Sequence, residues 1–285
     1  MNTLVSGFRF LRGRPRRRVP KIRIILCLAG MVLVLATCAR GQATPQPATL
    51  TVSAASSLTE AFQEMGRQFG AQHPGTTVVF NFAGSQQLAA QLAQGAPADV
   101  FASANRKQMD AAVKSGRVSI QAPVDFLQNR LVVVVPKQQK EAIGGLEDLA
   151  KPGLKLVLGA KEVPIGQYAL DFLDKAGRSG KYGSDFKNKV LGNVVSYEQD
   201  VKAVLTKVGL GEADAGVVYN TDASSAAGRV TSLPIPDDLN VVAVYTIGTV
   251  AGSAHADLAQ AFEAFVRSPQ GQAVVTKFGF QPISP

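Results

Sequence analysis

The sequence predicts an α/β protein in which mostly parallel sheets are flanked by helices, folded as two lobes. Short β-rich segments alternate with segments of helical periodicity from about residue 50 to the end of the chain. The nearly continuous apolar run at 131–136 (LVVVVP) separates two groups of such strand–helix units and is typical of a strand covered on both faces. Roughly 240 residues follow the N-terminal region, which is enough for two hydrophobic cores.

The individual elements follow from local patterns. β-branched, aromatic and apolar residues predict strands at 50–54, 77–82, 99–103, 131–136, 154–159, 190–195, 216–219 and 241–250. Apolar residues at helical spacing predict helices between them, the clearest being Leu58, Phe62, Met65 and Phe69. A second stripe runs through 201, 204, 205 and 208, and closing helices are expected around 258–266 and 271–278.

The first 37 residues have the pattern of an export signal. Eight basic side chains and no acid lie between residues 9 and 23, and residues 24–37 form an uncharged stretch of 14. That length suits the apolar region of a signal peptide better than a membrane span. A short membrane anchor is the alternative.

Cys38 directly follows this stretch and resembles the lipidated cysteine of bacterial lipoproteins. Thr37 departs from the small residue that usually precedes such a cysteine, so ordinary cleavage without lipid is the alternative. The only other cysteine is Cys27, inside the leader, so the processed chain has no disulfide. Residues 38–48 carry two prolines and polar residues and are expected to form a tether between the lipid-anchored cysteine and the folded part.

The charge of the chain resides mostly in its leader. The net charge is +9 from 30 basic and 21 acidic residues, and without the eight leader residues 22 basic residues face 21 acidic ones. No basic face remains to neutralise phosphates, so we expect no nucleic-acid partner.

Motifs for enzyme chemistry are scarce. The sequence lacks a Gly-Lys-Ser/Thr phosphate loop, a Gly-x-Ser-x-Gly elbow and a His-Glu-x-x-His helix, and its only histidines are His73 and His255. We therefore predict no catalytic residues, no direct metal ligands and no cofactor, although a hydrolase using carboxylates alone stays open.

Small polar or glycine-rich turns lead from several strands directly into helices. Examples precede Leu58, Gln86, Tyr168 and Val201. Ligands of open α/β sheets bind beyond the carboxyl ends of the strands, where helix N-termini present free N–H groups suited to an anion. A structural alternative exists for each polar residue in these turns.

In that alternative, Ser57 and Glu60 form a Ser-x-x-Glu capping box and Ser85 is an ordinary helix cap. Tyr219, at the end of a predicted strand, would then be a core residue with a satisfied hydroxyl.

Five stretches together resemble the bacterial periplasmic molybdate-binding proteins, substrate-binding components of molybdate ABC importers in the type II solute-binding family. They are AASSLTEAF, FAGSQQLAAQLAQGAPADVFASAN, LVVVVPK, VPIGQYA and AGVVYNTDA. The resemblance runs from about residue 50 to 280 and implies two lobes joined by hinge strands with the ligand in the cleft between them. We expect the lobes to comprise 49–130 plus 236–285 and 131–235.

The resemblance also implies the ligand groups. The hydroxyls of Ser57, Ser85 and Tyr219 and the backbone N–H groups of Ile165 and Val201 would hold molybdate or tungstate through its oxygens. Ile165 replaces a smaller residue, and Ser56 could exchange roles with Ser57. The implied partners are the permease of an ABC transporter and, through Cys38, the membrane; we expect a monomer located outside the cytoplasm.

Molybdate and tungstate are fully ionised dianions at neutral pH and accept hydrogen bonds only. We expect a site made of donors without a carboxylate, which would disfavour phosphate because phosphate retains a proton. Sulfate is also fully ionised, so a receptor for sulfate or another small anion is the nearest alternative. Less favoured alternatives are a lipid-anchored enzyme acting on a small anion and the sensing module of a transcription regulator.

Overall fold

The computed structural model describes residues 47–139 and 143–283. The predicted signal peptide and Cys38 lie outside the described residues. Ala48, which we assigned to the tether, already belongs to the first strand. No helix in the described ranges is both long and apolar enough to cross a membrane.

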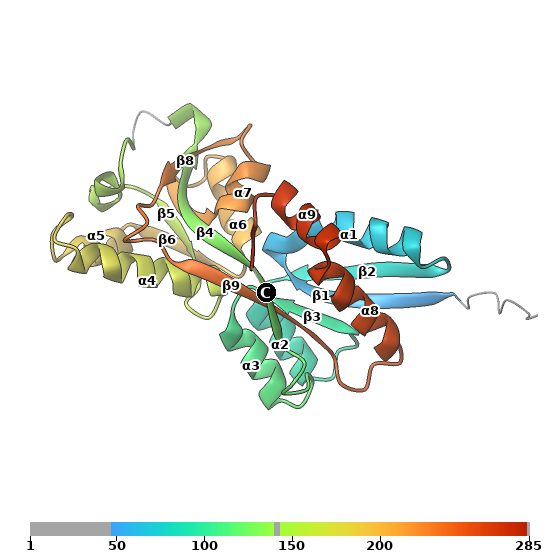
Figure 1. Cartoon of the computed structure of the whole chain (residues 1–285). Helices are drawn as coiled ribbons and strands as arrows, with labels where there is room; N and C mark the ends of the chain where they lie inside the picture. The colour runs from blue at the N-terminus through green and yellow to red at the C-terminus, as the bar shows by residue number, and fades with distance from the viewer. Residues whose placement is uncertain (1–46, 140–142, 284–285) are drawn as a thin grey trace, which may run out of the picture. The chain divides into compact units, whose positions relative to one another are not determined.

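The first lobe is built on a mixed sheet with the strand order β2-β1-β3-β9-β4 (Figure 1). Strands β1 and β2, and β1 and β3, pair in parallel, whereas β9 is antiparallel to both β3 and β4. Its strands are β1 (Ala48–Ala55), β2 (Thr76–Ala83), β3 (Val100–Ser103), β4 (Val124–Pro136), β9 (Val242–Thr249) and β10 (Gln281–Pro282). Its helices are η1 (Ser56–Leu58), α1 (Thr59–Gln72), α2 (Ser85–Ala93), α3 (Arg106–Lys114), α8 (Ala256–Arg267) and α9 (Pro269–Lys277).

The second lobe continues from the same strand β4. Residues 124–130 of β4 pair with β9, and residues 131–136 pair with β7 and β8. Its strands are β5 (Leu156–Gly159), β6 (Val194–Glu198), β7 (Ala215–Tyr219) and β8 (Val230–Pro234). Its helices are η2 (Lys137–Gln139), η3 (Leu146–Ala150), α4 (Pro164–Arg178), α5 (Phe186–Gly192), α6 (Val201–Gly209) and α7 (Asn220–Ser225).

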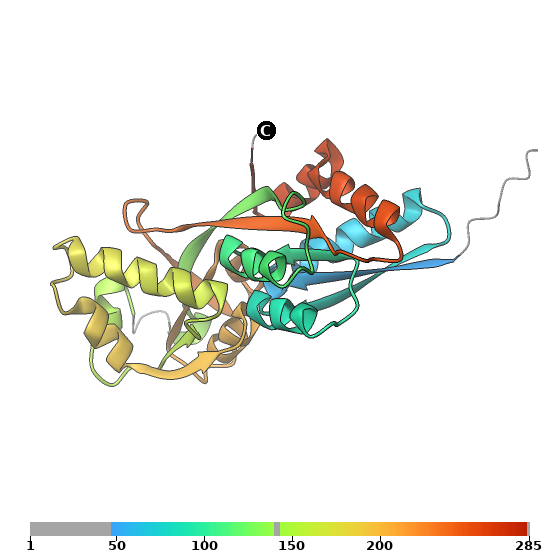
Figure 2. The same cartoon turned by 90° about the horizontal axis from the view of Figure 1, so that it is seen from below.

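Two adjacent strands connect the lobes. Strands β4 and β9 are antiparallel neighbours, and Figure 2 shows them passing together from one lobe to the other. The predicted α/β class with two lobes is thus confirmed, with sheets that mix parallel and antiparallel pairs. The residue ranges that we assigned to the lobes stay a prediction.

One predicted strand is wrong in position. We expected a strand at 190–195, but Val190 to Gly192 end helix α5 and the strand β6 occupies Val194–Glu198. Val190 is buried as part of the helix, whereas Val195 and Tyr197 on β6 are exposed, because β6 lies at the edge of its sheet. Burial of an apolar residue therefore did not indicate strand here.

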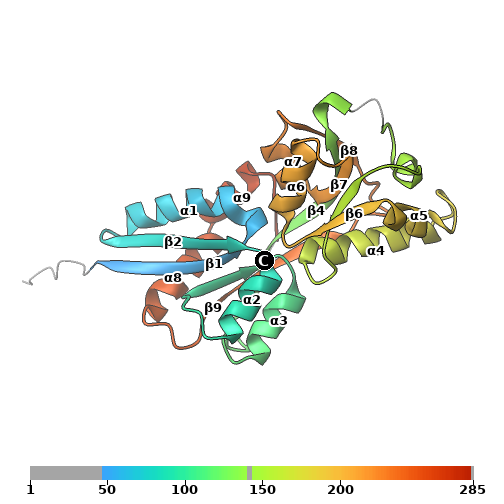
Figure 3. The same cartoon turned by 180° about the vertical axis from the view of Figure 1, so that it is seen from behind.

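The predicted stripe on α1 packs as expected. Phe62, Met65 and Phe69 are fully buried, and the ring of Phe62 meets that of Phe262 on α8 edge-on at 6.1 Å. This packing fixes α1 against the sheet and so fixes the short η1 turn that precedes it. Figure 3 shows the starts of α1 and α2 facing the second lobe at the ends of their strands.

Candidate functional site

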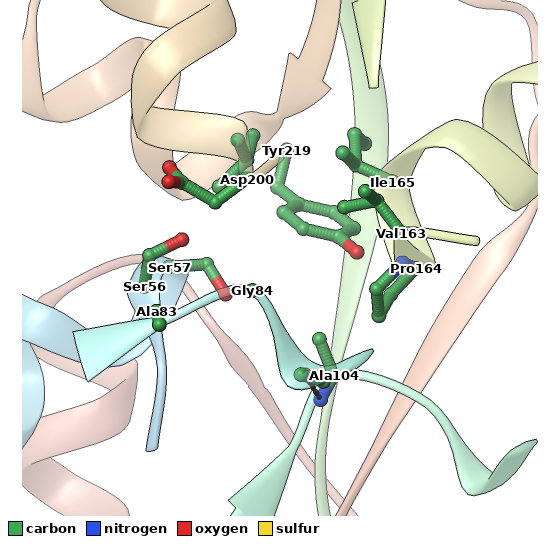
Figure 4. Close-up of a pocket in the computed structure, with 12 residues that line it drawn as sticks. Ser56, Ser57, Ala83, Gly84, Ala104, Val163, Pro164, Ile165, Asp200 and Tyr219 are labelled. Carbon is green, nitrogen blue, oxygen red and sulfur yellow. Dashed lines mark hydrogen bonds between the residues drawn. The ribbon is translucent and has the colours of Figure 1, made fainter. Parts of the chain in front are cut away.

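A cavity between the two lobes collects the starts of four helices. It comprises about 190 Å³ of empty space, which includes open solvent, and lies beyond the carboxyl ends of β1, β2 and β7 (Figure 4). The lining residues are Ser56, Ser57, Ala83, Gly84, Ser85, Ala104, Val163, Pro164, Ile165, Asp200, Val201 and Tyr219. All five predicted ligand-binding residues are among them.

Ser57 reaches the cavity through the η1 turn and does not cap a helix. Its Oγ lies 2.9 Å from the hydroxyl oxygen of Tyr245 on β9, and α1 has no side-chain cap. Glu60, the other half of the expected capping box, instead contacts Lys202 of the second lobe at 2.8 Å. The helix-cap interpretation of Ser57 is therefore wrong.

Ser85 lines the cavity and can donate a hydrogen bond to a ligand. Its Oγ accepts a hydrogen bond of 3.0 Å from the backbone N–H of Ala104, and Gly84 rather than Ser85 is the cap residue of α2. Ser85 is only 1% exposed. Because Ala104 supplies a proton to its oxygen, the hydroxyl proton of Ser85 is available to a ligand.

Tyr219 closes the side of the cavity formed by the second lobe. It ends β7, is 1% exposed, and its hydroxyl has no hydrogen-bond partner among the described residues. Burial raises the pKa of Tyr219 well above its ordinary value of 10, so the phenol stays protonated and can donate. A buried hydroxyl without a partner is costly, and a ligand in the cavity would satisfy it.

Ile165 and Val201 each lie in the first turn of a helix, α4 and α6, where backbone N–H groups lack acceptors within the helix. The side chain of Ile165 folds over Gly159, where an added Cβ would come within 2.7 Å of its Cγ2. An added Cβ at Gly166 would lie 2.0 Å from the carbonyl oxygen of Ala160, so only glycine lets α4 begin this close to β5. The bulkier Ile165 is thus accommodated by small neighbours.

Asp200 is a cavity residue that sequence reasoning missed. We expected no carboxylate in the site, and the structure corrects this. Asp200 is the N-cap of α6, and its Oδ1 accepts a hydrogen bond of 3.0 Å from the N–H of Ala203. In Figure 4 its carboxylate points away from the ring of Tyr219. An aspartate immediately before a helical stripe is the sequence signal for such a cap.

The described residues lining the cavity include no lysine, arginine or histidine. Lys202 follows the lining residue Val201 on α6, and its Nζ lies 2.8 Å from Glu60 of the first lobe and 3.0 Å from Asp222 of α7. No group of three or more metal-ligating side chains occurs in the described part of the chain. The site therefore offers neutral donors to a ligand.

Several direct contacts cross between the lobes beside the cavity. Gln86 donates to the carbonyl oxygen of Gln199 at 2.7 Å, and the Tyr168 hydroxyl donates to the carbonyl oxygen of Ala104 at 3.3 Å. Gly84 sits so close to Gln199 that an added Cβ would lie 2.2 Å from the same carbonyl oxygen. The lobes thus meet beside the cavity.

Known proteins of one family are similar to most of this chain. Residues 50–281 match the family model described as bacterial extracellular solute-binding protein. The molybdate-binding protein ModA of Mycobacterium tuberculosis is 37% identical over 90% of this chain and 95% of its own length. The corresponding protein of Escherichia coli is 33% identical over 84% of this chain and 91% of its own length.

Among solved structures, the sulfate-binding protein SubI of Mycobacterium tuberculosis superposes with a TM-score of 0.72 at 21% identity, covering 84% of this chain and 88% of SubI. At that identity the likeness concerns the fold alone. The family match over nearly the whole described region confirms the prediction of a binding protein rather than an enzyme: the chain belongs to the family of bacterial extracellular solute-binding proteins.

Proposed function

We propose that this protein captures molybdate or tungstate outside the cytoplasmic membrane and delivers it to the permease of an ABC importer. The observation that carries the proposal is the convergence of three buried hydroxyls and two helix N-termini on one cavity between the lobes whose described lining holds no cation. The molybdate-binding relatives support the choice of anion.

Neutral donors are sufficient for such a ligand. A hydrogen bond to a charged group contributes about 1.5–3 kcal/mol, so five donors can support a micromolar or tighter Kd, which requires roughly −8 kcal/mol. A dianion without protons can accept from all of them at once. Sulfate has the same hydrogen-bonding character, and selection against it then depends on the size of the cavity.

Calorimetric titration with molybdate, tungstate, sulfate and phosphate tests the proposal. We expect tight binding of molybdate or tungstate at one site and weak responses to the other two anions. Tight sulfate binding without a molybdate response would replace the substrate but keep the receptor role. The absence of binding of all four anions would refute the proposal.

Variants of the hydroxyl donors test the site. Ser85→Ala and Tyr219→Phe should each weaken molybdate binding by about 10–100-fold. Ser115→Ala is a matched control, because Ser115 caps the end of α3 by donating to Ala112. Tyr182→Phe is the matched control for Tyr219→Phe. The ring of Tyr182 packs against Phe186. Parental affinity in both site variants would show that the anion binds elsewhere.

Membrane attachment is a separate part of the proposal. We propose that Cys38, outside the described residues, is lipidated after removal of residues 1–37, with 38–48 as the tether, and that the protein acts as a monomer. Cys38→Ser should move the protein from the membrane fraction to the soluble extracytoplasmic fraction. An unchanged distribution would contradict lipidation, and gel filtration of this soluble form checks the monomer.

Delivery requires that the permease distinguish loaded from empty protein. We propose that it recognises the form in which the lobes are closed on the anion. Crosslinking to the permease should give a higher yield with loaded protein than with empty protein. Equal yields would contradict this step.

A further inference from the structure

The hydroxyls of Ser57 and Tyr245 form a pair at the wall of the cavity. Their oxygens are 2.9 Å apart, and the residues are 3% and 0% exposed. Ser57 lines the cavity, whereas Tyr245 lies behind it. A serine hydroxyl has one proton, so the direction of this hydrogen bond decides whether Ser57 offers a proton or only lone pairs to a ligand.

The surroundings of Tyr245 indicate that it is the donor. The Asn129 side chain on the neighbouring strand β4 accepts from the N–H of Arg130 through Oδ1 and donates from Nδ2 to Thr221 at 2.8 Å. Both polar groups of Asn129 thus have other partners, and Ser57 is the only hydrogen-bond partner of the Tyr245 hydroxyl among the described residues. The buried Tyr245 proton is satisfied only if it is donated to Ser57, because the opposite direction would leave that proton without an acceptor.

The ring of Tyr245 is fixed independently of its hydroxyl. It packs edge-on against Tyr219 at 5.8 Å and against Phe280 at 5.7 Å. These contacts hold the hydroxyl behind Ser57 and would persist if only that oxygen were removed. The hydroxyl can therefore be deleted with little change to the wall.

We propose that Tyr245 is a positioning residue that holds Ser57 as a hydrogen-bond donor to the bound anion, and so favours fully ionised oxyanions over those that still carry a proton. The inference rests on the proposed function. Ser85 is arranged in the same way, because the N–H of Ala104 occupies its oxygen. Both serines thus have a donor behind them that turns their own protons toward the cavity.

Without the Tyr245 hydroxyl, Ser57 could rotate and accept a proton from a ligand. Hydrogen phosphate would gain from that freedom, whereas molybdate would lose an oriented donor. Asp200 is present in the parent and in the Tyr245→Phe variant, and its Oδ1 accepts a hydrogen bond from the N–H of Ala203. A change in the molybdate-to-phosphate preference would therefore report on Ser57 rather than on the carboxylate.

The test is a double-mutant cycle of Tyr245→Phe and Ser57→Ala, with Kd for molybdate measured by calorimetry and phosphate by competition. We expect Tyr245→Phe to weaken molybdate binding about 2- to 10-fold and phosphate binding less, lowering the preference. In the Ser57→Ala background, Tyr245→Phe should have no further effect. Tyr182→Phe should leave both affinities unchanged, and thermal unfolding checks that each variant folds.

The outcomes separate the two proposals. Equal losses from Tyr245→Phe in both backgrounds, or an unchanged anion preference, would show that the hydroxyl does not act through Ser57 and would overturn the positioning role alone. A parent protein that binds none of the oxyanions would overturn the proposed function, and the positioning role with it.

Discussion

Asp222 is a buried carboxylate whose charge should be visible in the pH dependence of stability. Its side chain is 0% exposed, and neither oxygen accepts an aligned hydrogen bond within the described residues. Burial raises the pKa of Asp222 from its ordinary 3.8 to about 6, against the opposing effect of Lys202, whose Nζ is 3.0 Å from Oδ1. Burial acts to lower the pKa of Lys202, but Asp222 and Glu60 outweigh it and the pKa is raised.

The sign of the effect follows from proton linkage. Between pH 3.8 and about 6 the folded protein holds the proton of Asp222 more tightly than the unfolded chain does. The stabilisation from this proton is complete below pH 3.8 and is lost as the pH rises through about 6. The difference between the two pKa values corresponds to about 3 kcal/mol at pH 7.

The Asp222→Asn variant removes this titration and retains the shape of the side chain. We expect the free energy of unfolding of the parent, relative to the variant, to fall by about 2–2.5 kcal/mol between pH 4 and pH 7, because the unfolded aspartate is already partly ionised at pH 4. Urea denaturation at closely spaced pH values measures it, and subtraction of the variant cancels the other titrating groups. Asp110→Asn, at an exposed position on α3, is the control.

A difference between parent and Asp222→Asn that stays flat from pH 4 to pH 7 would refute the reasoning. It would mean that hydrogen bonds or water stabilise the ionised Asp222 carboxylate as well in the folded protein as in the unfolded chain. A difference that increases with pH would reverse the sign and identify the Lys202 contact as dominant over burial.

Three further perturbations address the contacts around the cavity. Lys202→Met should lower the free energy of unfolding at pH 7 by about 3–5 kcal/mol, because it leaves Asp222 buried without a countercharge. This loss should be smaller at pH 4, and urea denaturation at both pH values measures it. Gly84→Ala should weaken molybdate binding in titration but leave the unfolding temperature nearly unchanged, since the added Cβ would lie 2.2 Å from the Gln199 carbonyl of the other lobe. Gly166→Ala should instead lower the unfolding temperature, because its clash is internal to the second lobe, and an unchanged melting curve would contradict this.

The sequence predicted the fold where strong local patterns coincide with burial. The α1 stripe and the run at 131–136 are both buried as expected. In an amphipathic helix, and in a strand covered on both faces, every residue contributes to the pattern of apolar and polar positions that predicts the element. The strand expected at 190–195 failed because Val190 is buried at the end of a short helix, and a few apolar residues do not distinguish the two structures. Mixed pairing also has no local signal, since β9 joins strands far away in sequence.

The residues that line the candidate site were predicted, but the residues that hold them in place were not. Helix starts after strands point to the lining residues, and the structure brings Ser57, Ser85 and Tyr219 to one cavity. Their partners could not be predicted from spacing. Tyr245 lies 188 residues beyond Ser57, and Lys202 meets a carboxylate 142 residues earlier. Such pairs are created by the packing of β9 and of the two lobes.

The way charge is distributed around the cavity explains why closure and binding belong together. Lys202 is already shared between two carboxylates, and Asp200 adds a third negative group beside the cavity. A dianion is therefore not attracted by a net positive site and must be held by directed hydrogen bonds, which act only at short range. Ser57 and Ser85 belong to one lobe, while Tyr219 and the starts of α4 and α6 belong to the other. Neither lobe alone provides all the donors, so an anion can be fully coordinated only when the lobes meet, and the free energy of coordination itself favours the closed form.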